Sequence, residues 1–268
     1  MTPPPPFLSR PWDGNRLTLV TLMAILAPLT ASIVAHGPAG LAALALALVL
    51  AALWHLAFAK LRKRPPEWGG IVTAMIFVTL VPATVPLWQQ GVALSFGLVM
   101  GDLIFGGRGR GFLSPAAVSL AFLLFSFPVD AAHTTDTASA LAALAGGALL
   151  VIAGILSWRL VIGFCVAVAA CASQWPVPMI WPAWPCATLI LGLVFLIGDP
   201  IAAACTNAGR WIYGFLAGGL LVLLAHAGGD ILSSVVFAAL LTAIFAPLID
   251  QGVIWANVRR RARRLRHV

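Results

Sequence analysis

The stretch FGGRGRGFLSPAAV, Phe105–Val118, separates two long apolar segments of the sequence. Glycines alternate with Arg108 and Arg110, and Ser114 precedes a proline that can occupy the first turn of a helix. Glycines allow backbone conformations that end a helix sharply. The stretch therefore predicts a tight cationic corner between two helices, at the edge of a hydrophobic layer.

The composition is that of a membrane protein rather than of a soluble domain. Of 268 residues, 61% are hydrophobic and only 9% are charged, and the mean hydropathy is +1.01. A soluble domain carries about 25% charged residues, so most of this surface must face lipid. The formal net charge is +8, but the basic residues gather beside apolar runs. They indicate membrane topology and exclude nucleic-acid binding.

Apolar runs of the length of a membrane helix, about 20 residues, make up most of the chain. We expect an all-α polytopic membrane protein of about ten transmembrane helices, some of them broken. Residues 17–256 form one transmembrane domain, between a disordered cytoplasmic leader, 1–16, and a basic cytoplasmic tail, 257–268. The candidate spans are Leu17–Ala35, Ala39–Ala59, Gly70–Leu87, Val92–Ile104, Pro115–Phe127, Ala138–Leu156, Trp158–Ala172, Ala183–Ile197, Trp211–His226 and Ile231–Val253.

Lysine and arginine follow the positive-inside rule along the chain. With the N-terminus inside, the basic residues of Lys60–Arg64, of the Arg108 and Arg110 corner and of Arg259–Arg266 all fall on the inner side. The loops on the other side contain no Lys or Arg, and several contain Asp. This pattern predicts that both termini are cytoplasmic and that the basic tail contacts anionic lipids.

Two spans are interrupted by proline and polar residues. Pro82 and Pro86 fall in the third span, and Gly198-Asp199-Pro200 ends the eighth. Broken helices persist at membrane depth where they are buried in protein or line a cavity. Paired breaks in two halves of a chain indicate an inverted repeat with a ligand site between the halves. We expect the repeats at about 17–128 and 138–256.

Ionisable residues near the spans are rare: His55, Asp102, Asp199 and Asp250. Asp102 and Asp250 lie near inner ends, where we expect a structural role in pairing with Arg108 or Arg259; a functional role of an intramembrane carboxylate is the alternative. His55 is expected to hydrogen-bond a backbone carbonyl. Asp199 has two interpretations that the sequence leaves open, an Asx-type turn and a contact to a ligand or ion.

Metal binding and side-chain catalysis are not indicated by the sequence. The four cysteines show no Cys-x-x-Cys spacing, so we expect reduced thiols without a disulfide or metal site. The corner at Arg108, Arg110 and Ser114 is a candidate anion site, because Pro115 begins a helix whose free N–H groups point at it. It suits a phosphate, a semiquinone anion or a lipid headgroup; the alternative is a purely structural corner.

Four blocks of the sequence, in order, carry a resemblance to a known family. They are WGGIVTAMIFVTLVPATVPLW (68–88), FGGRGRGFLSPAA (105–117), GDPIAAACTNAGRWIYG (198–214) and FAPLIDQGVIWANVRRR (245–261). Together they resemble the B subunit of the sodium-pumping NADH:quinone oxidoreductase and the D subunit of the Rnf electron transport complex.

The resemblance implies a ten-helix fold with an inverted repeat, similar to urea channels, in the bacterial inner membrane. It implies an FMN esterified through its phosphate to a threonine near the outer face, and a second flavin or a quinone elsewhere. The subunit would pass electrons within a complex of membrane subunits that couples them to Na⁺ or H⁺ movement. The chain would be at most one subunit of an oxidoreductase.

One family motif is altered in this sequence. The family's flavin-bearing threonine ends a Ser-Gly-Ala-Thr motif that follows an Asp, and the matching stretch here is HTTDTASALAAL, 133–144. Asp136 and Ser139 match the start of the motif, but Ala142 occupies the attachment position. We therefore expect FMN or riboflavin to be held non-covalently, with quinone as a second cofactor.

Three functions remain open on these observations. The first is an electron-transfer subunit whose cofactor-binding residues are Arg108, Arg110, Ser114, Asp199, Thr206 and Asn207. The second is a small-solute transporter or channel with a urea-channel-like fold, since paired broken helices also suit a carrier. The third is an anchor subunit that has lost its cofactor.

Overall fold

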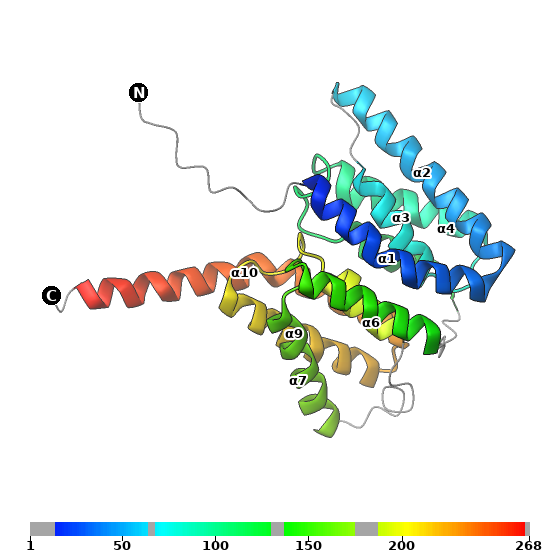
Figure 1. The fold of residues 1–268 in the computed structure, drawn as a ribbon. Coiled ribbons are helices and arrows are strands. Elements are labelled where there is room, and N and C mark those ends of the chain that lie inside the picture. Colours follow the sequence, from blue (N-terminus) through cyan, green and yellow to red (C-terminus); the bar gives the residue numbers. More distant parts are fainter. Residues whose placement is uncertain (1–13, 64–67, 130–136, 175–186, 266–268) are drawn as a thin grey trace.

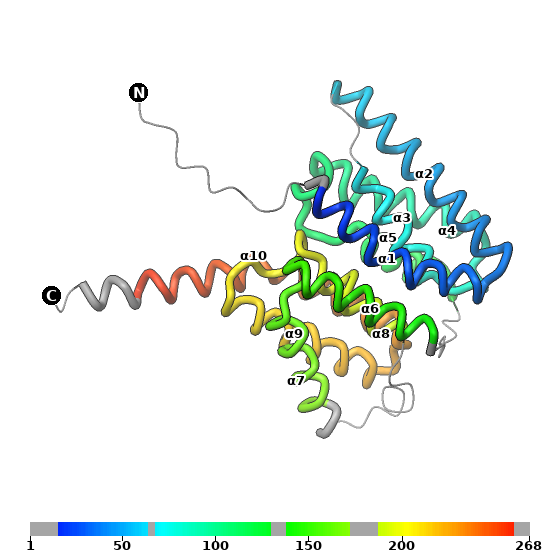
Figure 2. Tube along the Cα trace, in the orientation of Figure 1, coloured from blue at the N-terminus to red at the C-terminus, as the bar shows by residue number. Residues whose placement is uncertain are grey.

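The fold is a bundle of helices, seen in a computed structural model that describes residues 14–63, 68–129, 137–174 and 187–265 (Figures 1 and 2). Those residues contain no β-strand. Four helices are long and apolar enough to cross a membrane, Arg16–His36, Pro38–Arg62, Asn207–His226 and Ile231–Arg259, and five shorter apolar helices accompany them. The described part of the chain is therefore helical, and its long apolar helices are consistent with a polytopic membrane protein.

The first half contains α1 (Gly14–His36), α2 (Pro38–Arg62), α3 (Gly69–Leu80), α4 (Leu87–Leu98) with a π-helical end η1 (Val99–Leu103), and α5 (Pro115–Ser126). Helix α1 begins at Gly14, three residues before the first expected span. The third expected span is also shorter. It ends at Leu80, because the Val81 backbone turns extended ahead of Pro82, which removes a backbone donor.

The second half contains α6 (Thr137–Ile152), α7 (Trp158–Gln174), α8 (Ala187–Leu191) with a π-helical end η2 (Gly192–Ile197), α9 (Asn207–His226) and α10 (Ile231–Leu265). The 35 residues of α10 correspond to about 52 Å at 1.5 Å per residue, which exceeds the ~30 Å bilayer core. Its last turns project from the bundle (Figure 1). The boundary expected at residue 256 falls inside this helix.

Helix packing in the first half recurs five helices later in the second half. The pairs α1–α3, α2–α4, α3–α5 and α4–α5 are in contact, and so are α6–α8, α7–α9, α8–α10 and α9–α10. The halves meet where α1 packs on α6 and α5 packs on α10. The corner between η1 and α5 and the loop after η2 line one cleft where the halves meet.

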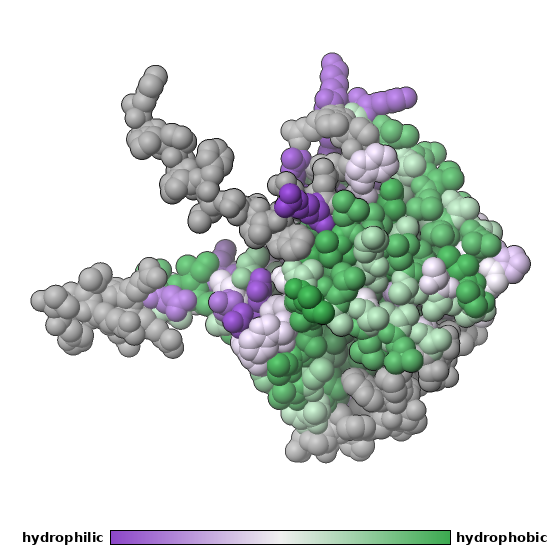
Figure 3. Space-filling view, in the orientation of Figure 1, coloured by the Kyte–Doolittle hydropathy of each residue, from purple (hydrophilic) through white to green (hydrophobic). Residues whose placement is uncertain are grey.

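Small residues allow the helices to approach closely, and apolar side chains cover the outside. A Cβ added at Gly218 of α9 would lie 2.6 Å from the Phe164 carbonyl oxygen of α7. Such close backbone contacts are typical of membrane helices. Figure 3 shows a mostly green, apolar face, with hydrophilic residues near the start of α1, at the end of α2 and on the coloured part of α10. That distribution agrees with a lipid-facing surface.

Candidate functional site

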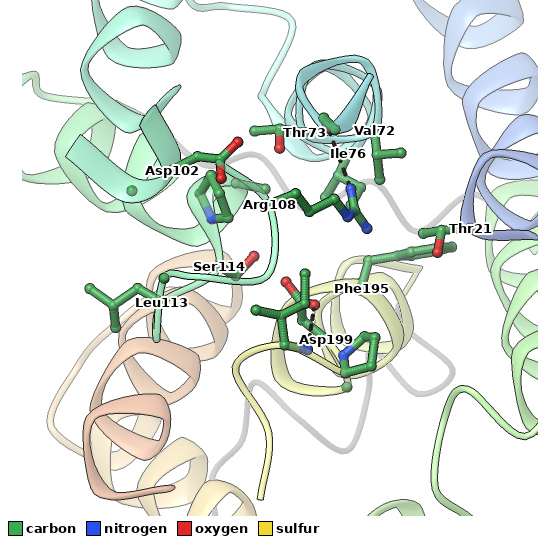
Figure 4. A pocket seen from close by; sticks show the side chains of 18 of the residues that line it. Thr21, Val72, Thr73, Ile76, Asp102, Arg108, Leu113, Ser114, Phe195 and Asp199 are labelled. Atoms are coloured by element: carbon green, nitrogen blue, oxygen red, sulfur yellow. Dashed lines mark hydrogen bonds between the residues drawn. The ribbon is translucent and has the colours of Figure 1, made fainter. Parts of the chain in front are cut away.

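A polar cleft lies between the two halves of the molecule, and we call it the inner cleft, after its place in the expected orientation. Its walls are α3, the corner between η1 and α5, and the loop after η2 (Figure 4). The corner glycines Gly106, Gly107 and Gly109 have φ values of 111°, 100° and 88°, which L side chains rarely adopt. This is how the glycine–arginine stretch turns back and brings Arg108 into the cleft.

Arg108 reaches across the inner cleft toward the loop that carries Asp199 (Figure 4). Its Nη1 donates a hydrogen bond of 3.4 Å to the Gly69 carbonyl oxygen at the start of α3. A Cβ at Gly69 would lie 2.8 Å from Cδ of Arg108, so glycine is needed there to accommodate the arginine stem. Gly69 therefore positions the guanidinium group.

Asp199 forms the Asx turn, one of the two roles that the sequence left open. Its Oδ1 accepts a hydrogen bond of 3.1 Å from the Ile201 N–H, which is an Asx turn, and the residue also lines the inner cleft. Burial raises the pKa of this loop carboxyl group, while the positive charge of Arg108 and hydrogen bonds from Ile201 and Ser114 oppose the shift. The positive charge of Arg108 therefore favours the ionised form of this carboxyl group.

Ser114 precedes α5 as expected, with Pro115 in the first turn, but its side chain does not cap that helix. The hydroxyl group instead helps to lower the pKa of the Asp199 carboxyl group. Ser114 is only 3% exposed. Arg108, Ser114 and Asp199 are therefore brought together from distant parts of the chain.

Asp102 and His55 form a contact that the sequence did not indicate. Nε2 of His55 and Oδ2 of Asp102 are separated by 3.9 Å, and both side chains are buried. The contact forms because Gly70 of α3 leaves room for the imidazole ring, which a Cβ there would strike. His55 therefore faces a carboxylate.

The ion pair expected between Asp250 and Arg259 is wrong. The Asp250 carboxylate accepts hydrogen bonds from the Cys205 N–H at 2.7 Å, the Thr206 N–H at 3.0 Å and the Thr206 hydroxyl at 2.6 Å. Arg259 lies more than two helical turns further along α10 and stacks over Trp255 at 3.5 Å. Through these hydrogen bonds, Asp250 links α10 to the corner that precedes α9.

The other three expected site residues lie outside the inner cleft. Arg110 is exposed, and its Nη1 donates to the Gly106 carbonyl oxygen at 2.7 Å. Thr206 caps α9 through the Gly209 N–H at 3.1 Å, and the Asn207 Oδ1 accepts from Arg159 at 2.9 Å. Each of these contacts shapes a corner of the fold.

A second, larger cavity lies at the opposite end of α3, and we call it the outer cavity. It is formed by the end of α1, the start of α2, the end of α3 and the loop 81–86 before α4. Its lining is mostly apolar, with a few polar side chains, Ser32, His36, Thr84 and Gln90. No sequence pattern indicates this cavity, because residues 36–38 resemble a simple short loop between the first two expected spans.

The two spaces differ in what they can hold. The free volume of the inner cleft is about 30 Å³, enough for a water molecule or a small ion but not for a three-ring flavin. The outer cavity has about 390 Å³, within the ~300–1,000 Å³ of typical cofactor pockets. A planar cofactor therefore fits the outer cavity rather than the corner where it was expected.

The altered flavin-attachment motif lies partly within the described residues. Ala142 is half-buried in α6, so no hydroxyl group is available at this position. Ser139 is buried in the first turns of the same helix. Asp136 and the neighbouring Thr134 and Thr135 lie outside the described residues.

These features define a class: a polytopic helical membrane protein with broken helices, a buried charged cleft and a cofactor-sized cavity. The NQR2, RnfD, RnfE family model matches residues 1–137 and 131–259. The chain belongs to this family.

Bacterial relatives agree with that membership. The B subunit of the Na⁺-translocating NADH-quinone reductase of Stutzerimonas stutzeri is 30% identical, over 82% of this chain and 68% of the relative. The subunits of the same name from Pseudomonas aeruginosa and Neisseria meningitidis are each 30% identical, over 81% of this chain and 67% of the relative. The expected family resemblance is confirmed.

Proposed function

We propose that the chain is a membrane subunit of an electron transport complex and passes electrons through a non-covalently bound flavin or quinone. The family match over both halves of the chain carries this proposal. Its relatives are subunits of a Na⁺-translocating NADH-quinone reductase. We place the chain in the bacterial inner membrane, with ten spans, an inverted repeat and both termini in the cytoplasm.

The outer cavity supports this function because its volume and lining suit a planar ring. Apolar walls with a few oriented polar groups are typical of cofactor sites. When bound, a flavin or quinone supplies the redox chemistry. The residues of this chain hold the ring, keep water away and shape its surroundings.

The inner cleft supports a role in coupling electron flow to ion movement. Its lining includes the carboxylates of Asp102 and Asp199 and the guanidinium of Arg108. Two carboxylates beside one guanidinium, in a cleft of about 30 Å³, suit a water molecule, a proton or a small cation. Arg108, Ser114 and Asp199 remain the site residues of this proposal, in contact with that small occupant.

The proposal is tested by purifying the chain together with its partners from native membranes. We expect other membrane subunits to co-purify and the preparation to show flavin absorbance that bleaches on addition of NADH. A chain that purifies alone, and without a chromophore under the same mild conditions, contradicts the proposal.

A small-solute carrier is the second candidate, favoured by one feature of α3. Val72, Thr73 and Ile76 line the inner cleft, and Val78 and Val81 line the outer cavity. A single broken helix thus separates two vestibules, as in carriers. This candidate is supported if a small neutral solute enters proteoliposomes that contain the protein and if the protein carries no bound chromophore. Proteoliposomes that stay impermeable to the solute exclude it.

A further inference from the structure

The end of α10 extends beyond the rest of the bundle. Asp250 is bonded to the corner before α9, so residues 251–265 lie past that corner (Figure 1). We call this segment the projecting end, and it is about 22 Å long at 1.5 Å per residue. Every residue from Ile254 to Arg259 is exposed, which is more than one full helical turn. No side of this turn is therefore buried against the described part of the bundle.

Apolar side chains recur along the projecting end with the spacing of paired helices. Trp255 and Val258 are 57% and 59% exposed, and the same spacing continues in the sequence. The residues that share it, which we call the seam, are Gln251, Trp255, Val258, Ala262 and Leu265. Steps of three and four residues place side chains on one stripe of a helix, as at positions a and d of a heptad. The seam is thus an unpartnered stripe, apolar except at Gln251.

Arginines flank this seam. With Trp255 and Ala262 at position a, Arg259 and Arg261 take positions e and g. The Arg259 guanidinium lies 3.5 Å from the centre of the Trp255 ring, so a positive charge lies at the edge of the apolar stripe. Side chains at e and g select a partner helix by charge. The complement of the projecting end is therefore a helix with carboxylates beside its own apolar stripe.

A second copy of this chain and a lipid surface match the seam less well. A second copy would place arginine against arginine at the flanking positions, and like charges across an interface are unfavourable. A lipid surface acts on exposed charges over a Debye length of ~8 Å at physiological salt. The projecting end leads away from the bundle over a greater distance than this (Figure 1).

We propose that the projecting end of α10 is a docking helix for a partner subunit, which contributes a helix whose apolar seam is flanked by Glu or Asp. The partner's apolar side chains cover Trp255 and Val258, and its carboxylates pair with the arginines at e and g. This inference goes beyond the proposed function, which requires partner subunits but states neither their chemistry nor where they bind.

The chemistry of the partner is tested with two synthetic helices on the full chain in nanodiscs of phosphatidylcholine. Both fluorescein-labelled peptides carry Leu at a and d; one carries Glu at e and g, and the other carries Lys there. We expect the Glu peptide to bind, measured by fluorescence anisotropy, and the Lys peptide to bind about tenfold more weakly or worse, because like charges then meet. Equal binding of the two peptides, or no binding of either, overturns the proposal.

The seam is tested with Val258→Asp and Asn257→Asp, which add the same charge to one turn of the helix. Both positions are exposed, but Asn257 lies outside the seam. Val258→Asp should weaken binding of the Glu peptide about tenfold or more, because a charge enters the apolar contact. Asn257→Asp should weaken it less than about threefold, as expected for a surface charge. Equal losses in the two variants overturn docking along the seam.

Two further results would assign the projecting end to another occupant. Loss of Glu-peptide binding in nanodiscs of phosphatidylglycerol would show that anionic lipid covers the projecting end, and would overturn the proposal. A dimer of the chain alone that Val258→Asp dissociates would make a second copy the occupant, with the same consequence. We expect a chain that stays monomeric and binds the Glu peptide in both lipids.

The flavin content of the same preparation reports on the proposed function separately. A chain that contains flavin but does not bind the Glu peptide overturns the docking helix and leaves the electron-carrying subunit. A chain that binds the Glu peptide without flavin supports the docking helix and contradicts the electron carrier.

Discussion

Single side chains in this molecule act as links between distant segments. Arg108 connects α3 with the loop of Asp199, and Asp250 connects α10 with the corner before α9. Such contacts matter in a membrane protein, where the apolar surface gives helices little driving force to associate. A buried polar group that loses its partner costs about 1–3 kcal/mol.

Asp250→Ala should therefore destabilise the protein by about 2–4 kcal/mol, because it leaves two N–H groups and one hydroxyl group without their acceptor. Asp250→Asn should cost less, since the amide oxygen still accepts from the corner. The free energy of unfolding, followed by tryptophan fluorescence in detergent, measures both. Equal stability of the two variants would show that the corner does not depend on this side chain.

Helix packing at the element scale depends on glycine at points of close approach. Gly218 of α9 faces α7, and an added Cβ would lie 2.6 Å from the Phe164 carbonyl oxygen and 2.8 Å from Cβ of Ala167. The neighbouring Gly219 has nothing within 4 Å of an added Cβ. The two positions lie on one helix, so they form a matched pair.

Gly218→Ala should push α7 and α9 apart and destabilise the protein by about 1–3 kcal/mol, as overpacking does. Gly219→Ala should be neutral or stabilising by up to ~1 kcal/mol, from the higher helix propensity of alanine. Thermal unfolding of the two variants in the same detergent provides the comparison. A loss of stability in Gly219→Ala as large as in Gly218→Ala would contradict this packing.

Element positions could be predicted from sequence because apolar runs, prolines and glycines act locally. Pro82 and Pro86 indicated the break in the third span, although the helix ends earlier, at Leu80. The extension of α10 was missed because arginine-rich turns are polar but still favourable for a helix. Contacts between distant segments were predicted poorly. His55 meets Asp102 only because helix packing brings α2 and η1 together, and no local pattern indicates this.

The local nature of sequence signals also explains which residues of the candidate site could be predicted. Arg108, Ser114 and Asp199 stood out as polar residues in apolar surroundings, and they meet in the inner cleft. Thr206 and Asn207 had the same appearance but serve as a helix cap and an arginine partner. Gln90 was missed because it follows a proline-containing loop in the sequence, where an exposed polar residue is usual.

At the scale of the whole molecule, the basic corners are expected to share one side of the membrane. Lys60, Arg62, Arg108, Arg110, Arg159 and Arg210 lie at helix ends or corners that the positive-inside rule assigns to the cytoplasm. Cys205 is exposed at one of these corners, so it is a natural reporter of orientation.

A membrane-impermeant maleimide should label Cys205 in inside-out vesicles and not in intact spheroplasts. Cys205→Ser should remove that label. This variant is the control for labelling of the other cysteines. Labelling of Cys205 from the outer side would reverse the expected orientation and exchange the inner cleft and the outer cavity.

The central claim is that this chain carries a flavin without a covalent bond. The most direct measurement is the visible spectrum of the full chain purified in mild detergent, followed by a denaturing gel viewed under ultraviolet light. We predict a yellow protein whose flavin separates from the band on denaturation. Fluorescence that migrates with the band, or a colourless protein, would contradict the claim.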